Sequence, residues 1–230
     1  MQAVILMAGK GTRMAKHFQG PKQLLPVNGK PVVEHVLDAL PDVVTELIFV
    51  VGGPHEATLR EYFKMGEYKG KPITFVVQEQ QLGLAHAYRC AKDLITGSWL
   101  GLVADDLYVK KDLERLVAAT PALLSLHVSN PEMFGVLVKD EEGYLVRAVE
   151  KPKEFVSDQI WIGAMAMEPD FFDVETAPSA RGEYETPDVW TKLIQEKNKR
   201  IKIVEGTFWF PVNDKDQLEE AEQALKNAGK

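Results

Sequence analysis

The sequence predicts a three-layer α/β/α domain whose mainly parallel central sheet carries an antiparallel extension. Up to about residue 121, short apolar runs alternate with segments of helical periodicity, a pattern typical of βαβ units and a parallel sheet. From residue 122 on, apolar runs follow one another across short turns, which favours antiparallel strands. Of the 230 residues, 45% are hydrophobic and 27% are charged, the composition of a globular protein with a sizeable core.

Four buried strands are expected in the first half of the chain. Each is a short, partly β-branched apolar run that ends at a turn, and they cover residues 3–7, 46–51, 73–77 and 99–103. Helical periodicity lies between them, over residues 31–40, 55–65, 84–94 and 110–119. Ligands of parallel sheets bind beyond the carboxyl ends of the strands. We therefore expect the loops after Met7, Val77 and Val103 to form the walls of a site.

The second half is expected to add strands and a helical cover to this sheet. Apolar runs predict strands over residues 123–128, 134–139, 145–149 and 160–167. Residues 140–143 form a hairpin-like turn, with Gly143 where a positive φ is needed. A helix over 185–197, a strand over 201–204 and a closing amphipathic helix over 214–228 complete the chain. No repeat or linker interrupts it, so we expect one domain over residues 1–230.

Composition and charge exclude several classes of function. The longest uninterrupted apolar run, residues 3–8, is six residues, far below the roughly 18 of a membrane span, and it lacks the flanks of a signal peptide. Cys90 is the only cysteine, so a reducing compartment fits. The net charge of −7 disfavours nucleic acid as a partner. We expect a cytoplasmic protein with small-molecule substrates and no membrane partner, and a homo-oligomer stays open.

The first loop with chemical interest follows the first strand. Gly9 and Gly11 would open the dinucleotide pattern G-x-G-x-x-G, but the third position is Met14 and no acidic residue follows a second strand. No stretch has the order of a P-loop either. Backbone N–H groups of the remaining small residues can converge on phosphate oxygens, with Arg13 adding a planar fork of donors. A tight turn with a surface arginine is the alternative.

Lys22 lies in a second loop, Gly20-Pro-Lys-Gln-Leu-Leu-Pro26, where a proline fixes the backbone and a lysine suits a polyphosphate. Together the two loops resemble the signature of the sugar-1-phosphate nucleotidylyltransferases, most closely glucose-1-phosphate thymidylyltransferase and UTP–glucose-1-phosphate uridylyltransferase. The resemblance implies a Rossmann-like, nucleotide-diphospho-sugar transferase-like fold, with the nucleotide on residues 1–121 and the sugar phosphate on 122–230. It gives Arg13 and Lys22 catalytic roles and assigns nucleotide contacts to Leu6, Ala8, Gly9, Gly11, Thr12 and Gln23.

The resemblance continues at Gln78 and at Gly83 in the segment Gly83-Leu-Ala-His-Ala87. In the family this segment binds uracil or thymine, which implies that the Gln78 side chain pairs with the pyrimidine edge and that the Gly83 backbone lies close to the ring. The chemistry agrees, because an amide offers a donor and an acceptor together and glycine has no Cβ to block the base. For Gln78 taken alone, an exposed strand end is the alternative.

Asp105 follows the buried strand over 99–103, where a carboxylate favours a cation. The resemblance implies that Asp105 is a catalytic residue and binds Mg²⁺, which takes oxygen ligands from one or two carboxylates, phosphates and water. Asp106 occupies the next position, where relatives vary. Capping of the next helix is the alternative for a strand-end aspartate, and it suits Asp106 better than Asp105.

Several positions in the second half resemble the sugar-phosphate site of the family. Phe134-Gly135-Val136 and Val149-Glu150-Lys151-Pro152 resemble its sugar-site strand and E-K-P motif. The resemblance implies that Gly135 lets the backbone meet the sugar, that Glu150 accepts hydrogen bonds from sugar hydroxyls and that Lys151 neutralises the sugar phosphate. Gly163 and Glu183 match further sugar contacts. An adjacent Glu-Lys pair is also common on ordinary surfaces.

One position departs from the family pattern. The usual sequence near the end is Trp, any residue, then an aspartate that shares the metal, but here Trp209-Phe210 is followed by Pro211, which has no side-chain ligand. Either Asp105 holds the metal with phosphates, water and Asp106, or Asn213 or Asp214 contributes, or catalysis is impaired. Asp214 also suits the N-cap of the closing helix. We expect an active enzyme with weaker metal binding than its relatives.

The resemblance as a whole implies Mg²⁺-dependent nucleotidyl transfer. A nucleoside triphosphate, UTP or dTTP, and a sugar 1-phosphate would give an NDP-sugar and pyrophosphate by in-line attack on the α-phosphorus. One alternative is a cytidylyltransferase acting on another phosphate such as phosphocholine, and another is a nucleotide-sugar-binding paralogue without turnover. Longer family members add a carboxy-terminal β-helix domain, which we do not expect here.

Overall fold

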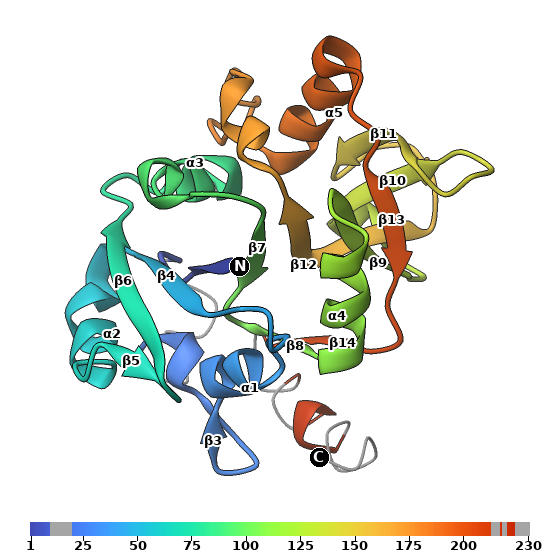
Figure 1. Ribbon diagram of the computed structural model, residues 1–230. Helices are drawn as coiled ribbons and strands as arrows, with labels where there is room; N and C mark the ends of the chain where they lie inside the picture. Colours follow the sequence, from blue (N-terminus) through green and yellow to red (C-terminus); the bar gives the residue numbers. More distant parts are fainter. Residues whose placement is uncertain (10–19, 213–216, 218–219, 224–230) are drawn as a thin grey trace.

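The computed structural model describes residues 1–9, 20–212, 217 and 220–223 of the chain, and Figure 1 shows their arrangement. Ten strands of this part form one sheet. They are β1 (Gln2–Leu6), β4 (Glu46–Val51), β5 (Glu67–Tyr68), β6 (Lys71–Val77), β7 (Trp99–Val103), β9 (Ala122–His127), β10 (Gly135–Lys139), β11 (Leu145–Glu150), β12 (Gln159–Met167) and β13 (Lys202–Glu205).

The sheet has a mainly parallel half and a mainly antiparallel half that meet at β7 and β12; the exceptions are the antiparallel β5–β6 pair and the parallel β9–β13 pair. Its order is β11-β10-β12-β7-β1-β4-β6-β5, with β9 on β12 and β13 on β9. β1 pairs in parallel with β4 and β7, and β4 with β6, whereas β12 runs antiparallel to β7, β9 and β10. The predicted mainly parallel sheet with an antiparallel extension is confirmed.

Helices cover both faces of this sheet. They are α1 (Val32–Asp38), α2 (Glu56–Tyr62), α3 (Leu84–Arg89), α4 (Lys110–Ala118) and α5 (Thr186–Lys197). Ala3 and Ile5 of β1, and Met7 directly after it, pack in one buried cluster with side chains of α1, α2 and α4. Val4 and Leu6 of β1 pack in another cluster with α3 and α5. Because successive side chains of a strand point to opposite faces, these two clusters make the three predicted layers.

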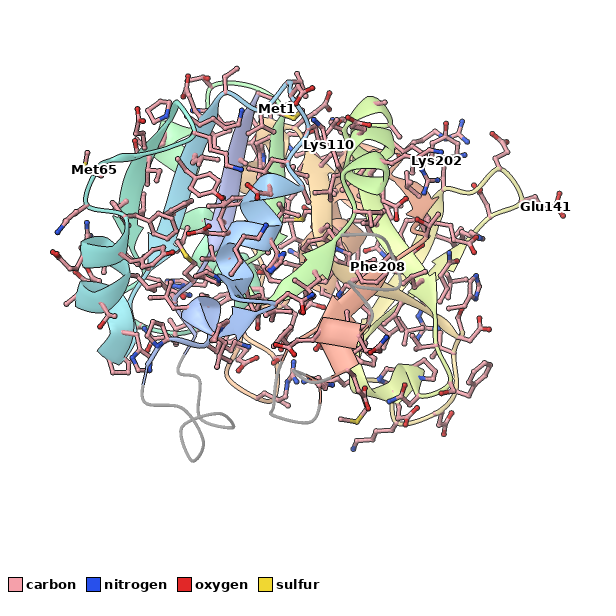
Figure 2. All side chains as sticks on the ribbon, turned by 90° about the horizontal axis from the view of Figure 1, so that it is seen from below. Met1, Met65, Lys110, Glu141, Lys202 and Phe208 are labelled. Carbon is pink, nitrogen blue, oxygen red and sulfur yellow. The ribbon has the colours of Figure 1, made fainter. Side chains whose placement is uncertain are left out.

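Most predicted elements agree with the structure to within a few residues, with differences at helix ends. The helix predicted over 84–94 is divided into α3 and a 3₁₀ turn, η4 (Lys92–Leu94). Gly143 has the predicted positive φ of 79° in the hairpin turn, whose tip at Glu141 projects from the body in Figure 2. Further 3₁₀ turns are η2 (Lys22–Leu24), η3 (Gly53–His55), η5 (Pro131–Met133) and η6 (Pro169–Asp173). Of the closing helix, residues 217 and 220–223 are described, and they are helical.

Two short strand pairs were not expected from the sequence. β2 (Pro26–Val27) and β3 (Lys30–Pro31) form a hairpin whose turn residues Asn28 and Gly29 both have positive φ, a turn typical of Asn-Gly. β8 (Asp106–Tyr108) and β14 (Trp209–Pro211) pair antiparallel. This second pair places residues 209–211 beside the segment that follows β7 in the chain.

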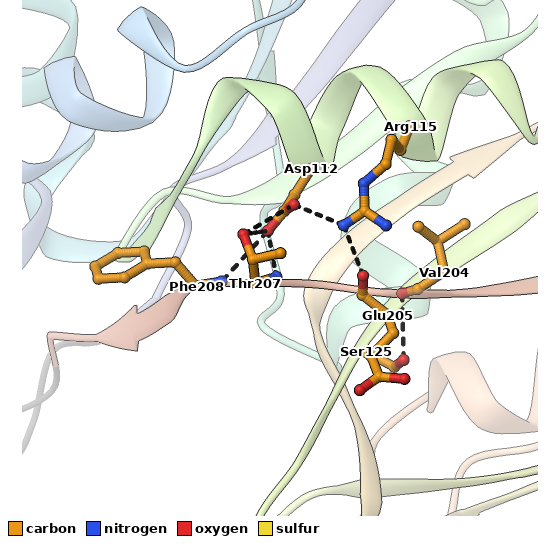
Figure 3. A network of polar contacts seen from close by, with 7 residues as sticks. All are labelled: Asp112, Arg115, Ser125, Val204, Glu205, Thr207 and Phe208. Carbon is orange, nitrogen blue, oxygen red and sulfur yellow. Dashed lines mark hydrogen bonds and ion pairs between the residues drawn. The ribbon is translucent and has the colours of Figure 1, made fainter. Parts of the chain in front are cut away.

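A buried carboxylate fixes the approach to β14, as Figure 3 shows. Asp112 of α4, whose exposed fraction is 0%, accepts hydrogen bonds from the backbone N–H groups of Thr207 (2.6 Å) and Phe208 (3.3 Å). Arg115 donates to Asp112 (2.7 Å) and to the backbone oxygen of Glu205 (2.7 Å). These bonds hold the turn that leads into β14. No helix in the described part of the chain is long and apolar enough to cross a membrane.

Candidate active site

A cavity of about 580 Å³ opens beyond the carboxyl ends of the strands. Because β1 and β7 are parallel, with Leu6 beside Val103, the loops after both strands reach the same edge of the sheet. All the predicted site residues that the structure describes line this cavity, namely Leu6, Ala8, Gly9, Lys22, Gln23, Gln78, Gly83, Asp105, Gly135, Glu150, Lys151, Gly163 and Glu183. The predicted Gly11, Thr12 and Arg13 lie outside the described residues.

Lys22 and Asp105 form an ion pair within the cavity. Lys22 opens η2, directly after Pro21, whose φ is −67°, and the side chain of Gln23 anchors this turn by donating to the backbone oxygen of Met7 (3.3 Å). Asp105 follows β7. The two side chains are only 18% and 17% exposed, so a cation and an anion share a partly desolvated wall. Such a pair can bind phosphate through the ammonium and a metal ion through the carboxylate.

The neighbouring Asp106 has a different environment. It is 8% exposed and accepts a hydrogen bond from Nε1 of Trp209 (2.8 Å). Burial and the charge of Asp105 raise the pKa of Asp106 well above its usual range. Both residues line the cavity, but Asp106 serves as a buried hydrogen-bonding group, whereas Asp105 presents the carboxylate that is paired with a cation.

Pro211 occupies the wall next to these carboxyl groups. It lies opposite Asp106 in the β8–β14 pair and lines the cavity, and the next residue, Val212, donates its N–H to the backbone oxygen of Asp105 (3.0 Å). Asn213 and Asp214, the alternatives for a second ligand, lie outside the described residues. Within the described ranges, no group of three or more His, Cys, Asp and Glu side chains is arranged to hold a metal ion.

Gln78 and Gly83 lie at the end of the cavity beside β6. Gln78 is 3% exposed and its Nε2 donates to the backbone oxygen of Gly83 (3.2 Å). Gly83 has a φ of +99°, and a Cβ there would lie 2.7 Å from the backbone oxygen of Tyr184. The backbone N–H of Tyr184 donates to Leu82 (2.7 Å), and Ala85 donates to Tyr184 (3.1 Å). Glycine is therefore required by the loop at Tyr184, a reason that the sequence alone did not supply.

Gly135, Glu150 and Lys151 come together on the antiparallel half. Gly135 lies opposite Glu150 in the β10–β11 pair, and a Cβ on Gly135 would lie 3.2 Å from Oε2 of Glu150. The chain turns at Lys151, whose φ is +43° and whose N–H donates to the backbone oxygen of Phe134 (2.9 Å). The Glu150 and Lys151 side chains form an ion pair, with charged atoms 4.0 Å apart, and both line the cavity.

Gly163 marks the point where β12 changes partners. Its φ is +76°, and the register of β12 with β9 shifts between Trp161 and Met165. A Cβ on Gly163 would lie 2.7 Å from the Tyr108 hydroxyl and 2.9 Å from Oδ2 of Asp106. The absence of a side chain thus lets β12 pack against the group that supports the Lys22–Asp105 wall.

Arg181 is a functional candidate that the sequence analysis missed. Its Nη2 donates to Oε1 of Glu150 (3.1 Å) and to Oε1 of Glu185 (2.7 Å), and it lies 3.7 Å from Oε2 of Glu183. Burial and the charge of Glu185 raise the pKa of Glu150, and Arg181 opposes this shift. One cation thus orients carboxylates of the cavity wall. The sequence signal for Arg181 was its position next to Gly182-Glu183. Its contact with Glu150 could not be predicted, because Glu150 is 31 residues away in the sequence.

The remaining lining residues missed by sequence reasoning are mostly apolar or amide side chains. They include Gln81, Leu84, Ala87, Val103, Met133 and Trp161. Each is close in sequence to a predicted site residue. The periodicity of the strands and helices around the predicted residues could have indicated which neighbours face the same cavity.

Comparisons with known proteins identify the family of this chain. The family model described as nucleotidyl transferase matches residues 2–228. A bifunctional protein GlmU from Methanococcus vannielii is 36% identical over 218 residues, 91% of this chain and 51% of the relative. The UTP–glucose-1-phosphate uridylyltransferase AglF from Haloferax volcanii is 32% identical over 238 residues, 98% of this chain and 97% of the relative. The chain therefore spans about half the length of the GlmU relatives and nearly all of AglF.

Two solved structures share the fold. One is described as a glucose-1-phosphate thymidylyltransferase from Bacillus anthracis in complex with sucrose, with a TM-score of 0.83 and 24% identity, covering 99% of this chain and 96% of that one. The other is a UDP-glucose pyrophosphorylase complexed with UDP-glucose, with a TM-score of 0.80 and 25% identity, covering 99% and 98%. These matches confirm the predicted fold class and the family resemblance seen in the sequence.

Proposed function

The chain belongs to the nucleotidyl transferase family, whose sugar-phosphate members make NDP-sugars, and we propose that it transfers a nucleotidyl group from UTP or dTTP to a sugar 1-phosphate. One observation carries the proposal: a single cavity of about 580 Å³ is lined by Gln78, by the Lys22–Asp105 pair and by Glu150 with Lys151. In the sheet, β7 lies between β6, which precedes Gln78, and β11, which ends at Glu150. The base and the sugar would therefore lie on opposite sides of the reacting phosphates.

The proposed reaction needs no covalent bond to the protein. An oxygen of the sugar phosphate attacks the α-phosphorus of the nucleotide in line, a new P–O bond forms, and the bond to the β-phosphate breaks to release pyrophosphate. Lys22 and Arg13 hold the triphosphate and the leaving pyrophosphate, and Lys151 holds the incoming phosphate. Catalysis then consists of positioning two anions that repel one another and of neutralising their charge.

The donor set of the cavity fits Mg²⁺ with one protein carboxylate. Asp105 lines the cavity with its carboxylate, whereas Asp106 is buried and bonded to Trp209, and Pro211 offers no ligand. Mg²⁺ commonly keeps waters and takes one or two carboxylates plus substrate phosphates. Asp105 would hold the ion, which supplies charge neutralisation at the phosphates when bound.

The choice of nucleotide rests on Gln78 and Gly83. A buried amide that meets the base discriminates because a wrong base leaves its hydrogen bonds unmade. The name of AglF includes UTP and glucose 1-phosphate, and the name of one structural neighbour includes thymidylyl transfer. UTP and dTTP both carry a 4-keto pyrimidine base. We therefore propose that this chain selects a nucleotide with a 4-keto pyrimidine.

The proposal also covers the organisation and setting of the protein. Residues 1–230 form one domain, with the nucleotide on residues 1–121 and the sugar phosphate on 122–230. The substrates are small molecules of the cytoplasm, in keeping with a single cysteine. The net charge of −7 opposes non-specific binding to nucleic acid.

Pyrophosphate release over a grid of substrates tests the proposal. UTP, dTTP, CTP, ATP and GTP are each combined with a series of sugar 1-phosphates and with phosphocholine, in the presence of Mg²⁺. We expect release with UTP or dTTP and a sugar 1-phosphate. Equal or better turnover of CTP with phosphocholine would support the cytidylyltransferase alternative. Nucleotide binding without release for any pair would support the paralogue that does not turn over.

A further inference from the structure

The polar groups of Gln78 are almost all used by the protein. Its backbone N–H donates to the oxygen of Val51 (2.7 Å), and its backbone oxygen accepts from Nε2 of Gln81 (3.1 Å). Its side-chain Nε2 lies 3.2 Å from the backbone oxygen of Gly83 and 3.0 Å from Nδ1 of His86. Gln78 is thus held from β4, from its own loop and from α3.

These contacts fix both the amide and the imidazole. The backbone oxygen of Gly83 can only accept, so the Gln78 atom beside it must be the NH₂ group and not the carbonyl oxygen. The same NH₂ group faces His86, so Nδ1 of His86 must carry a lone pair. In the neutral ring the proton then lies on Nε2. The hydrogen-bond network, and not the assignment of hydrogens, determines this tautomer.

The orientation leaves one group of Gln78 for a ligand. Both N–H bonds of its NH₂ group point at protein acceptors. Oε1 makes no hydrogen bond to any described residue, and it is absent from the fully enclosed side-chain atoms without a partner. Gln78 lines the cavity and only 3% of its surface is exposed, so we infer that Oε1 is the atom of its side chain that is available to a ligand there.

His86 is itself held from two sides. It lies in the first turns of α3, whose N-cap is Gly83, and its ring is 6.1 Å from the ring of Tyr184 at a tilt of 31°. The Tyr184 loop is fixed to the start of α3 through the backbone bonds to Leu82 and Ala85. Nδ1 therefore stays beside Gln78.

We propose that His86 is a positioning residue that sets base specificity by holding Gln78 with only its Oε1 acceptor toward the base. The inference rests on the proposed function, since the base must bind at this end of the cavity. Uracil and thymine carry N3–H and can donate to Oε1. Cytosine carries an unprotonated N3, which would place two acceptors face to face. Removing His86 frees one N–H of the amide, and Gln78 can then turn a donor toward cytosine.

The first test needs no substrate. A long-range ¹H–¹⁵N NMR spectrum of the whole chain reports which imidazole nitrogen of His86 is protonated, with His86→Asn used to assign the signals. We expect Nδ1 without a proton and Nε2 with one. A proton on Nδ1 in the neutral ring would overturn the inference, because that nitrogen could not accept from Gln78.

The second test compares the ratio of kcat/KM for UTP and CTP in three variants. His86→Phe keeps a ring but removes the acceptor, whereas the oxygen of His86→Asn can replace Nδ1. His127→Phe is the control, because His127 is exposed and pairs with Asp158. We expect the ratio to fall roughly three- to tenfold in His86→Phe, to be restored in His86→Asn and to stay unchanged in the control.

The outcomes separate this inference from the proposed function. A ratio unchanged in His86→Phe, with wild-type preference for UTP intact, would contradict the role of His86 alone. A wild-type chain that turns over no nucleotide would contradict the proposed function, and the tautomer of His86 would still decide whether Gln78 is held as described. If His86→Phe does not fold, the ratio in His86→Asn and the NMR result decide.

Discussion

Lys22 and Asp105, the proposed reaction centre, are two common charged side chains in an unusual setting. Each is held by its neighbours: Lys22 by Pro21 and the anchored Gln23, Asp105 by the end of β7 and the backbone bond from Val212. Their ion pair lies in a partly desolvated cavity wall. Charge in such a place interacts with phosphate more strongly than charge on an open surface.

Lys22→Ala should remove most activity without unfolding the chain. Loss of one preorganised donor to the reacting phosphates typically costs about a hundred- to a thousandfold in rate. Steady-state pyrophosphate release measures the effect, and circular dichroism checks the fold. Lys64→Ala is the matched control, because Lys64 pairs with Glu61 on the exposed surface of the molecule. Activity of the Lys22 variant near that of the control would contradict the assigned role.

Pro211→Asp should lower the magnesium concentration needed for half-maximal turnover, by several-fold. Pro211 lines the cavity opposite Asp106, so an aspartate there adds a second carboxylate near Asp105, and Mg²⁺ takes one or two such ligands. Magnesium titrations of the native chain and the variant measure the change. An unchanged or higher requirement would show that this strand position does not reach the ion.

At the scale of elements, two connections shape the cavity from a distance. The turn before β14 is held by Asp112 of α4 (Figure 3), and β14 places Trp209 against Asp106. The loop that contains Arg181 is tied to Glu150 of β11 and, through Tyr184, to the start of α3. Elements far apart in sequence therefore fix both walls of the site.

Asp112→Ala should destabilise the protein by about 1–3 kcal/mol, because it leaves buried N–H groups without acceptors. Burial alone would raise the pKa of Asp112, but hydrogen bonds from Thr207 and Arg115 outweigh it and hold the pKa below the usual value. Because folding lowers the pKa of Asp112, the ionised carboxylate stabilises the folded protein at pH values above its ordinary pKa near 3.8. This stabilisation is lost as the pH falls through the pKa of Asp112 in the folded protein.

Urea unfolding at pH 7 and below pH 4 measures both effects in the wild type, Asp112→Ala and the exposed control Asp93→Ala. The free-energy gap between wild type and Asp112→Ala should narrow at low pH. A gap that stays constant over this range would show that the ionised carboxylate is not what stabilises the turn.

Arg181→Ala should raise KM for the sugar 1-phosphate by roughly tenfold, since hydrogen bonds to charged groups are worth about 1.5–3 kcal/mol and Arg181 is 38% exposed. Without it, Glu150 keeps Lys151 but loses the cation that most strongly opposes its raised pKa. KM for the nucleotide should change less. Arg181→Lys should recover part of the effect, and Arg200→Ala, in an exposed pair with Glu142, serves as the control. Equal increases in both KM values would indicate general disruption of the cavity.

At the scale of the whole molecule, the sheet brings the two proposed substrate sites together at one cavity. The parallel half places Gly9, Gln78 and Asp105 at one edge, and the antiparallel half places Glu150 and Lys151 at the same cavity. The two halves meet where β7 pairs with β12. We propose that the nucleotidyl transfer takes place at that junction.

Sequence reasoning predicted this arrangement where the signal was local. The strands β4 and β7 were predicted with their observed bounds because each is a continuous apolar run between turns. The β8–β14 pair was not predicted, because each strand has three residues and only long-range contacts, such as Trp209 with Asp106 across 103 residues, define it. Arg181 was not predicted for the same reason, because its contact with Glu150 is long-range. Gly163 was predicted as a site residue, and it lines the cavity. The reason that this position must be glycine depends on tertiary packing and cannot be read from the sequence.

The measurement that tests the central claim most directly is ³¹P NMR of the wild-type chain with UTP, a sugar 1-phosphate and Mg²⁺. The proposed transfer predicts that an NDP-sugar and pyrophosphate appear in equal amounts, and only when both substrates are present, because the sugar phosphate is the nucleophile. The signals should be absent in Lys22→Ala over the same time. Release of phosphate or pyrophosphate from UTP without the sugar phosphate, or no new signal with any sugar 1-phosphate, would contradict the account.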